Sequence, residues 1–274
     1  MKKSLIWVLA VIITVGAAYY QRKTGPTYPK KIKMEVAGAI HEFKLLRTSN
    51  NDKDAKIEIL IQDTSITGSL NYKLFPVDDN WKTIDLVRNA DKLIAYLPKQ
   101  PAAGKLQYYV SLSKKYNPEN TVNSELVIIR FKGNVPAWAM IPHILLMFLA
   151  MLFSTISGIM AAINNEKQML YGRLTLLFLI VGGMIFGPVI QQFAFGQAWT
   201  GVPFGWDLTD NKTLIALIFW LIAVLVNMKK ANYRITLLAS IILFLIYIIP
   251  HSLYGSEFDY SQGKVVTGII TGIF

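Results

Sequence analysis

Residues 138–163 read WAMIPHILLMFLAMLFSTISGIMAAI, a run without Asp, Glu, Lys or Arg. A helix rises 1.5 Å per residue, so this run is long enough to cross the roughly 30 Å hydrocarbon core of a bilayer. Similar runs follow at about 173–193, 213–228 and 234–250, and another, Ser4–Tyr20, lies near the N-terminus. The run 213–228 is short, but it can extend at both ends. The sequence therefore predicts a membrane bundle of five transmembrane helices.

The N-terminal run has two interpretations. Lys2 and Lys3 precede it, and Gly16, Ala17 and Ala18 resemble the small-residue cleavage region of a signal peptide. The chain retains this segment from Met1 onward, so we expect residues 1–24 to act as an uncleaved transmembrane anchor.

Composition divides the chain into two parts. Hydrophobic residues make up 53% of the 274 residues and charged residues only 16%, which is too apolar for a simple soluble domain. Most Lys, Asp and Glu residues lie in 25–134, whereas 136–250 is a series of apolar runs. We therefore expect a soluble domain at 25–134 and a membrane domain at 135–274. The net charge of +11 comes without a basic nucleic-acid motif, which argues against nucleic-acid binding.

The chain contains no cysteine. This excludes a disulfide framework, a Cys-ligated metal, covalent haem attachment through this chain and thiol redox chemistry. A metal or haem iron would have to take its ligands from His or Met.

The soluble part has the pattern of β-strands. In Lys56–Gln62, Ile57, Ile59 and Ile61 alternate with other residues, and Gln107–Ser113 and Glu125–Lys132 are similar short runs. The stretch 97–110 is typical of a strand, a turn and a second strand. Several short strands in about 110 residues predict an inserted all-β, immunoglobulin-like sandwich. His41 is expected to be an ordinary strand or surface residue.

The charges between the helices indicate an orientation. The links 164–173 and 228–234 are basic, whereas 195–212 carries two Asp and one Lys. The positive-inside rule then places the basic links and the N-terminus in the cytoplasm. The basic stretch Arg22–Lys33 opens a long translocated domain, and such domains do not obey the rule. We expect a bacterial inner-membrane protein whose soluble domain and C-terminus are periplasmic.

The link 195–212, FGQAWTGVPFGWDLTDNK, is rich in aromatic residues and glycine. His143 near the start of the second predicted helix and His251 at the end of the fifth are expected on the same side of the membrane. Together they predict a site for a flat apolar ligand, for which haem is the candidate. His143 and His251 would be its metal ligands. The remaining expected cofactor-binding residues are Phe195, Trp199, Phe204, Trp206, Asp207 and Tyr254.

Each of these residues also has a simpler interpretation. The histidines could cap helix ends or lie among lipid headgroups. Asp207 and Asp210 could bind a cation, or they could cap the following helix. If the histidines bind iron, their second ring nitrogens need partners, and the available carboxylates are Asp207, Asp210, Glu257 and Asp259.

Residues 206–210, Trp-Asp-Leu-Thr-Asp, followed by the apolar run from Leu214, resemble the tryptophan-rich haem-handling proteins of cytochrome c biogenesis. The resemblance implies an external aromatic loop flanked by haem-ligating histidines, the positions of His143 and His251. This loop has fewer tryptophans, residues 200–205 look like an insertion, and family members have more helices. The Pro-His motifs and the tyrosine-containing tail are also similar to small bacterial membrane proteins suspected of binding b-type haem. Together the two resemblances cover about 195–260 and His143.

The leading functional hypothesis is a protein that binds or handles haem at the periplasmic face, in electron transfer or cytochrome c assembly. Its partners would be the lipid bilayer, envelope proteins and a c-type cytochrome. The alternative is a non-catalytic accessory subunit of an envelope complex, with the sandwich as its docking module. A transporter is disfavoured because the helices carry almost no charge at midplane. A serine hydrolase is disfavoured because its nucleophile motif is absent.

Overall fold

The computed structural model describes residues 3–250 and 255–266. The chain divides into two compact units. The helical unit comprises Met1–Pro26 and Val135–Gly255, and the strand unit comprises Thr27–Asn134 and Ser256–Phe274. The chain thus leaves the helical unit after its first helix, forms most of the strand unit, and then returns.

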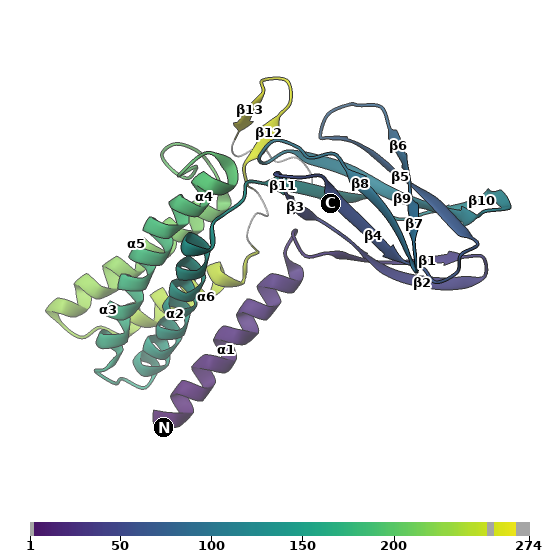
Figure 1. Cartoon of the computed structure of the whole chain (residues 1–274). Helices are drawn as coiled ribbons and strands as arrows, with labels where there is room; N and C mark the ends of the chain where they lie inside the picture. Colours follow the sequence, from purple (N-terminus) through teal and green to yellow (C-terminus); the bar gives the residue numbers. More distant parts are fainter. Residues whose placement is uncertain (1–2, 251–254, 267–274) are drawn as a thin grey trace. The chain divides into compact units, whose positions relative to one another are not determined.

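The helical unit consists of long helices that lie lengthwise against one another (Figure 1). Four apolar stretches within the described residues are long enough to cross a membrane: Ser4–Thr24, Ala137–Ala162, Gln168–Phe195 and Leu208–Lys229. Trp220 of the fourth stretch and Leu243 of a shorter helix, Tyr233–Ile248, belong to a buried cluster between the helices. The elements are α1 (Lys3–Thr24), α2 (Ala137–Ala162), α3 (Gln168–Phe178), the π-helix η1 (Leu179–Phe186), α4 (Gly187–Phe195), α5 (Leu208–Lys229) and α6 (Tyr233–Ile248).

Two of the predicted spans differ from the helices that form. The run predicted at 173–193 belongs to a longer stretch, Gln168–Phe195, and a π-helix interrupts that stretch at its middle. The run predicted at 234–250 forms α6, which has 16 residues. A helix usually needs about 20 residues to span a bilayer. By length and composition the described structure therefore has four candidate spans plus one shorter apolar helix.

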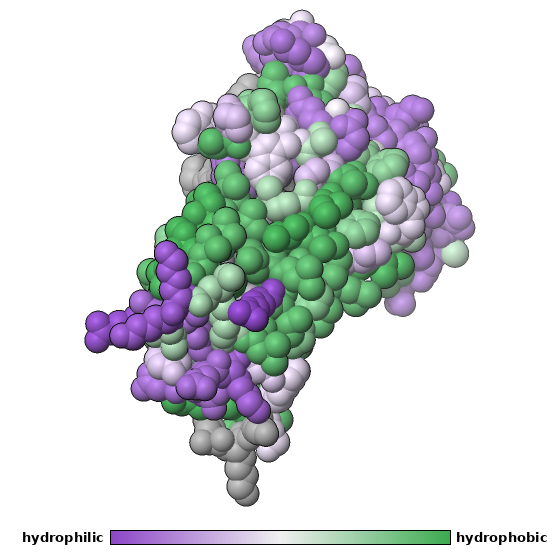
Figure 2. All heavy atoms as spheres, turned by 90° about the vertical axis from the view of Figure 1, so that its left-hand side faces the viewer, coloured by the Kyte–Doolittle hydropathy of each residue, from purple (hydrophilic) through white to green (hydrophobic). Residues whose placement is uncertain are grey.

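The outer surface of the helical unit is apolar. Figure 2 shows a broad band of hydrophobic side chains over this unit, with hydrophilic residues gathered below the band. Leu145, Leu225 and Leu245 are among the large side chains that remain exposed on three different helices. Soluble proteins rarely leave so continuous an apolar surface uncovered, and a bilayer is an environment that would cover it.

The strand unit is built mainly from two antiparallel sheets and one hairpin. The larger sheet has the order β3-β11-β9-β5-β6, and β10 also pairs with β9; the smaller has the order β4-β8-β7; β1 and β2 form the hairpin. Only β3 and β11 run parallel. The strands are β1 (Lys30–Val36), β2 (Ala39–Leu45), β3 (Thr48–Asn50), β4 (Ala55–Leu60), β5 (Ile66–Phe75), β6 (Lys82–Asp85), β7 (Val87–Asn89), β8 (Lys92–Leu97), β9 (Lys105–Lys114), β10 (Asn117–Asn123) and β11 (Val127–Lys132).

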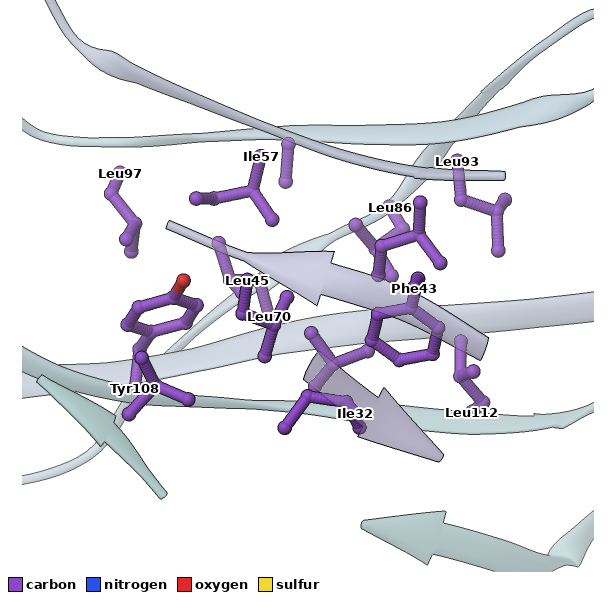
Figure 3. Packing of buried hydrophobic residues seen from close by; sticks show 14 of the residues in the cluster. Ile32, Phe43, Leu45, Ile57, Leu70, Leu86, Leu93, Leu97, Tyr108 and Leu112 are labelled. Carbon is purple, nitrogen blue, oxygen red and sulfur yellow. The ribbon is translucent and has the colours of Figure 1, made fainter. Parts of the chain in front are cut away.

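One hydrophobic core joins the two sheets. Figure 3 shows Ile57 and Leu97 of the smaller sheet on the opposite side of the core from Leu70 and Tyr108 of the larger one. The predicted alternation in β4 is confirmed, because Ile57, Ile59 and Ile61 are all buried. Alternate side chains of a strand point to opposite faces, so this sequence pattern by itself selects the inner face of the sheet.

The described tail residues 256–266 belong to the strand unit, whereas the sequence predicted the tail as part of the membrane domain. β12 (Glu257–Asp259) and β13 (Lys264–Val266) form a hairpin. The backbone N–H of Phe258 donates to the carbonyl of Ala103 at 3.2 Å. Hydropathy could not reveal this placement, because a three-residue strand carries too few apolar residues to indicate which core it joins.

Candidate functional site at the loop end of the helical unit

The start of α2, the end of α4, the loop 196–207, the start of α5 and the end of α6 form one end of the helical unit, here named the loop end. Two contacts bring these segments together. The rings of Trp138 on α2 and Phe193 on α4 meet edge to face with centroids 6.0 Å apart. Lys212 Nζ on α5 donates to the carbonyl of Ile249 after α6 at 3.0 Å.

His143 lies in the second turn of α2 and is half-buried. Its Nδ1 is 2.8 Å from the carbonyl oxygen of Gly182 in η1. A carbonyl can only accept, so Nδ1 carries the proton and donates it. In the neutral ring the lone pair is then on Nε2. The expected partner of this ring was a carboxylate, but a backbone carbonyl orients it instead.

The π-helix explains why this carbonyl reaches His143. The Gly182 oxygen also accepts from the N–H of Gly187, five residues on, and its second lone pair serves the histidine. A Cβ on Gly182 would lie 2.8 Å from Leu146 Cβ, and one on Gly183 would lie 2.8 Å from Thr213 Cγ2. The two glycines therefore let η1 pack tightly against both α2 and α5.

The loop 196–207 is closed onto the first turn of α5. Asp210 Oδ2 accepts from the backbone N–H of Thr200 at 2.6 Å and from its hydroxyl at 3.0 Å. Gln191 Nε2 donates to the same hydroxyl at 2.5 Å. Asn211 Oδ1 accepts from the N–H of Val202 at 2.8 Å. These bonds connect the loop to α4 on one side and to the first turn of α5 on the other.

Asp207 is the N-cap of α5. Its Oδ1 accepts from the backbone N–H of Thr209 at 2.8 Å and of Asp210 at 3.4 Å. Asp207 and Asp210 are both buried, and each carboxylate binds the loop or the helix start. The structure thus supports the capping interpretation for Asp207, whereas Asp210 binds the loop through Thr200.

The expected aromatic platform is divided between two environments. Phe204 is 80% exposed and Trp206 is 77% exposed. Phe195 and Trp199 are half-buried, and the Trp199 indole donates to the carbonyl of Val202 at 3.2 Å. The structure therefore does not enclose the four rings around one cavity, and the two most exposed rings lie in the loop 196–207.

Lys212 is a residue of the loop end that the sequence analysis did not single out. It is buried, and its Nζ donates to the carbonyls of Ile249 at 3.0 Å and Pro250 at 3.4 Å. Gln21 of α1 donates to the carbonyl of Tyr247 at 2.6 Å. Carbonyls at the C-terminus of a helix lack partners within the helix, and these side chains provide them. A lysine just inside an apolar run was the only sequence signal for this role.

His251 and Tyr254 lie outside the described residues. Within residues 3–250 and 255–266, no group of three or more His, Asp or Glu side chains is placed to hold a metal ion. The site as described therefore consists of His143 with its oriented ring, the Lys212 contacts to residues 249–250, and the closed aromatic loop.

The two tail carboxylates that were expected near the histidines have partners in the strand unit. Glu257 forms a buried ion pair with Lys105. Asp259 Oδ1 accepts from the N–H of Ser261 at 2.8 Å, and Oδ2 accepts from Gln262 Nε2 at 2.7 Å. Burial lowers the pKa of Lys105, and the hydrogen bond to Glu257 counteracts this shift.

Comparisons with known proteins add no relative. No family model matches the chain, and neither a curated protein nor a solved structure matches it.

Proposed function

We propose that this protein spans a bacterial inner membrane and binds or handles haem at the periplasmic face, in electron transfer or in the assembly of a c-type cytochrome. The observation that carries the proposal is His143, whose Nδ1 is bonded to the Gly182 carbonyl at 2.8 Å. Metal-ligating histidines usually donate their other ring N–H to a carbonyl or carboxylate in this way.

The membrane placement is supported by the four long apolar helices and by the exposed apolar surface of the helical unit. In the proposal, α6 is the fifth span, extended beyond its 16 helical residues by Ile249 and Pro250. The basic links 164–173 and 228–234 would be cytoplasmic, which puts the loop end in the periplasm.

The proposed periplasmic domain is an immunoglobulin-like sandwich. Its support is the strand order, β3-β11-β9-β5-β6 in one sheet and β4-β8-β7 in the other. Consecutive strands β4 and β5 lie in different sheets, and so do β8 and β9, as the Greek-key connections of such sandwiches require. One core lies between the two sheets.

The residues at the loop end fit haem in part. His143 offers Nε2 as a neutral ligand, because its proton is held on Nδ1. His251 would be the second ligand; it directly follows Pro250, whose carbonyl Lys212 binds. Phe195 and Trp199 would contact the macrocycle. Asp207 has no ligand role in this proposal, since its carboxylate caps α5. When bound, haem would supply one-electron chemistry; the chain would bind and orient it.

Variants of the three histidines can test haem binding, because His41 provides a control for His143 and His251. Full-length protein purified in detergent should show a Soret band, and haem content should fall strongly in His143→Ala and in His251→Ala. His41→Ala is the control, because His41 lies in β2 of the strand unit. The proposal fails if wild-type protein that was loaded with haemin and then freed of unbound haemin retains no Soret band, or if the double variant His143→Ala/His251→Ala keeps the wild-type haem content.

A second function has one observation in its favour. On the smaller sheet, Leu60, Val87 and Tyr96 share the outward face, and Val87 is 68% exposed. An accessory subunit that docks an envelope partner would use such a face. Crosslinking of the full-length protein in its native membrane should then yield a partner that Val87→Lys/Tyr96→Lys loses and His143→Ala keeps. The opposite pattern would favour the haem site over docking.

A further inference from the structure

An open groove lies between α1, α2 and α6, outside the site described above. Its volume is about 330 Å³. All its walls belong to the helical unit. The lining residues are Ile13, Thr155, Gly158, Ile159, Ala162, Leu237, Ser240, Ile241 and Phe244.

The polar atoms of the groove are already satisfied. Ser240 Oγ donates to the carbonyl of Ser154 at 2.8 Å, and Thr155 Oγ1 donates to the carbonyl of Met151 at 2.9 Å. The remaining walls are hydrocarbon apart from backbone, and Ile241 is 47% exposed. The groove therefore favours an apolar occupant that makes no hydrogen bonds.

The groove follows α6 lengthwise. From Leu237 to Phe244 it extends over seven residue steps of this helix, or roughly 10 Å at 1.5 Å per residue. A single hydrocarbon chain can lie along this length and make only apolar contacts with the walls.

One turn before the groove begins, α6 carries an exposed cation. Arg234 precedes Leu237 by three residues and Ile241 by seven, so it lies on the same face of α6. It is exposed, and within the described part of the chain it forms no hydrogen bond or ion pair. Arg234 to Phe244 covers about 15 Å, which is half the thickness of a bilayer core and thus one leaflet.

We propose that this groove binds one acyl chain of an anionic phospholipid and that Arg234 binds its phosphate. The inference rests on the membrane insertion assumed under the proposed function, but not on haem. The basic links would put this end of the groove in the cytoplasmic leaflet, where anionic lipids attract juxtamembrane cations. The lipid would tie α1 to α2 and α6 in a defined leaflet.

Native mass spectrometry of the detergent-purified full-length protein tests the proposal, with phosphatidylglycerol and phosphatidylcholine of identical acyl chains as probes. Wild-type protein should retain more phosphatidylglycerol. Arg234→Gln should reduce phosphatidylglycerol binding by about fivefold, or roughly 1 kcal/mol, and leave phosphatidylcholine unchanged. Ala162→Phe and Ile241→Trp fill the groove from its exposed walls, so either variant should reduce the binding of both lipids.

Arg173→Gln is the matched control, because Arg173 is an exposed cation of the other basic link and lies on α3, which contributes no residue to the groove. It should bind both lipids as wild type does. Equal losses in Arg173→Gln and Arg234→Gln would overturn the proposal in favour of a diffuse basic belt. A lipid-free dimer dissociated by Ala162→Phe would overturn it in favour of a second copy of the chain. Unchanged haem content in Arg234→Gln separates this result from the proposed function.

Discussion

Lys105 in the strand unit and Lys212 in the helical unit are both buried, with exposed fractions of 6% and 4%. Lys105 pairs with the carboxylate of Glu257, whereas Lys212 donates to the backbone carbonyls of Ile249 and Pro250. One buried charge is thus neutralised by an opposite charge. The other binds the partial negative charge at a helix C-terminus.

Each lysine binds a late segment of the chain within its own unit. Lys212 binds the backbone of residues 249–250 in the helical unit, and Lys105 binds Glu257 in the strand unit. Arg130 adds a bond to the carbonyl of Ser256. Because a buried cation is costly without a partner, each lysine selects the chain segment that supplies one.

The largest effect is expected from breaking the strand-unit pair. Glu257→Gln leaves Lys105 buried without its counter-charge, and such a loss typically costs about 3–5 kcal/mol. Denaturant unfolding of the full-length protein should show this loss in the transition of the strand unit. Glu42→Gln is the control: the exposed Lys33–Glu42 pair joins neighbouring strands, and its loss should barely change the transition. An unchanged transition in Glu257→Gln would mean that the buried pair contributes little.

The helical-unit lysine should show a smaller effect. Lys212→Met keeps the aliphatic stem but leaves the carbonyls of Ile249 and Pro250 without this donor. The expected loss is about 1–3 kcal/mol. Thermal unfolding in detergent measures it, with Lys229→Met at the exposed end of α5 as control. If Lys212→Met and Lys229→Met lose the same amount of stability, the hydrogen bonds from Lys212 to the backbone carbonyls do not stabilise the helical unit.

The N-cap of α5 tests whether a side-chain partner also stabilises the other kind of helix end, the N-terminus. Asp207→Ala removes the acceptor for the N–H groups of Thr209 and Asp210, at a typical cost of about 1 kcal/mol. Asp207→Asn should restore most of this stability, because an asparagine oxygen also caps. Thermal unfolding distinguishes the two. Equal losses in both variants would show that the charge of Asp207, and not its capping geometry, matters.

Replacement of Tyr260 is expected to have the smallest effect on stability, and this effect should depend on pH. Its Oη accepts from the N–H of Lys105 at 3.1 Å, and burial raises the pKa of Tyr260 to about 12. An unfolded tyrosine titrates near 10, so between pH 10 and 12 the unfolded state loses protons that the native state keeps. The contribution of Tyr260 to stability is therefore complete below pH 10 and is lost as the pH rises through this range.

Tyr260→Phe should lower stability at pH 8 by about 1 kcal/mol through the lost hydrogen bonds. It should also reduce the decline in stability above pH 10, as measured by denaturant unfolding at several pH values. Burial also raises the pKa of Tyr108. Part of the decline in stability above pH 10 should therefore remain in Tyr260→Phe. An identical alkaline decline in wild type and Tyr260→Phe would exclude this linkage.

Much of the fold could be predicted from local patterns. The alternation of Ile57, Ile59 and Ile61 identifies a strand and its inner face, and the charge-free run 138–163 coincides with α2 to within one residue at each end. Such periodicities depend only on residues close in sequence. The π-helix at 179–186 and the placement of the 257–266 hairpin depend on packing partners elsewhere in the chain, and no periodicity records them.

The candidate site was less predictable than the fold. His143 could be singled out because a histidine in an apolar run is unusual, but its partner is the carbonyl of Gly182, and a backbone atom leaves no mark in the sequence. Asp207 and Asp210 were visible as carboxylates. Whether they bind a ligand, a loop or a helix N-terminus depends on distances between segments, which composition does not contain.

The sequence alone determined that a long apolar portion surrounds an inserted portion of alternating strands, and that cysteine chemistry is excluded. Hydropathy and strand alternation are properties of neighbouring residues, so these conclusions needed no coordinates. Only the tertiary structure decided that Lys105 pairs with Glu257, that Lys212 caps the end of α6, and that Gly182 orients His143. Buried polar groups must find partners, but which partner each one finds is settled by the packing of segments that are distant in the chain.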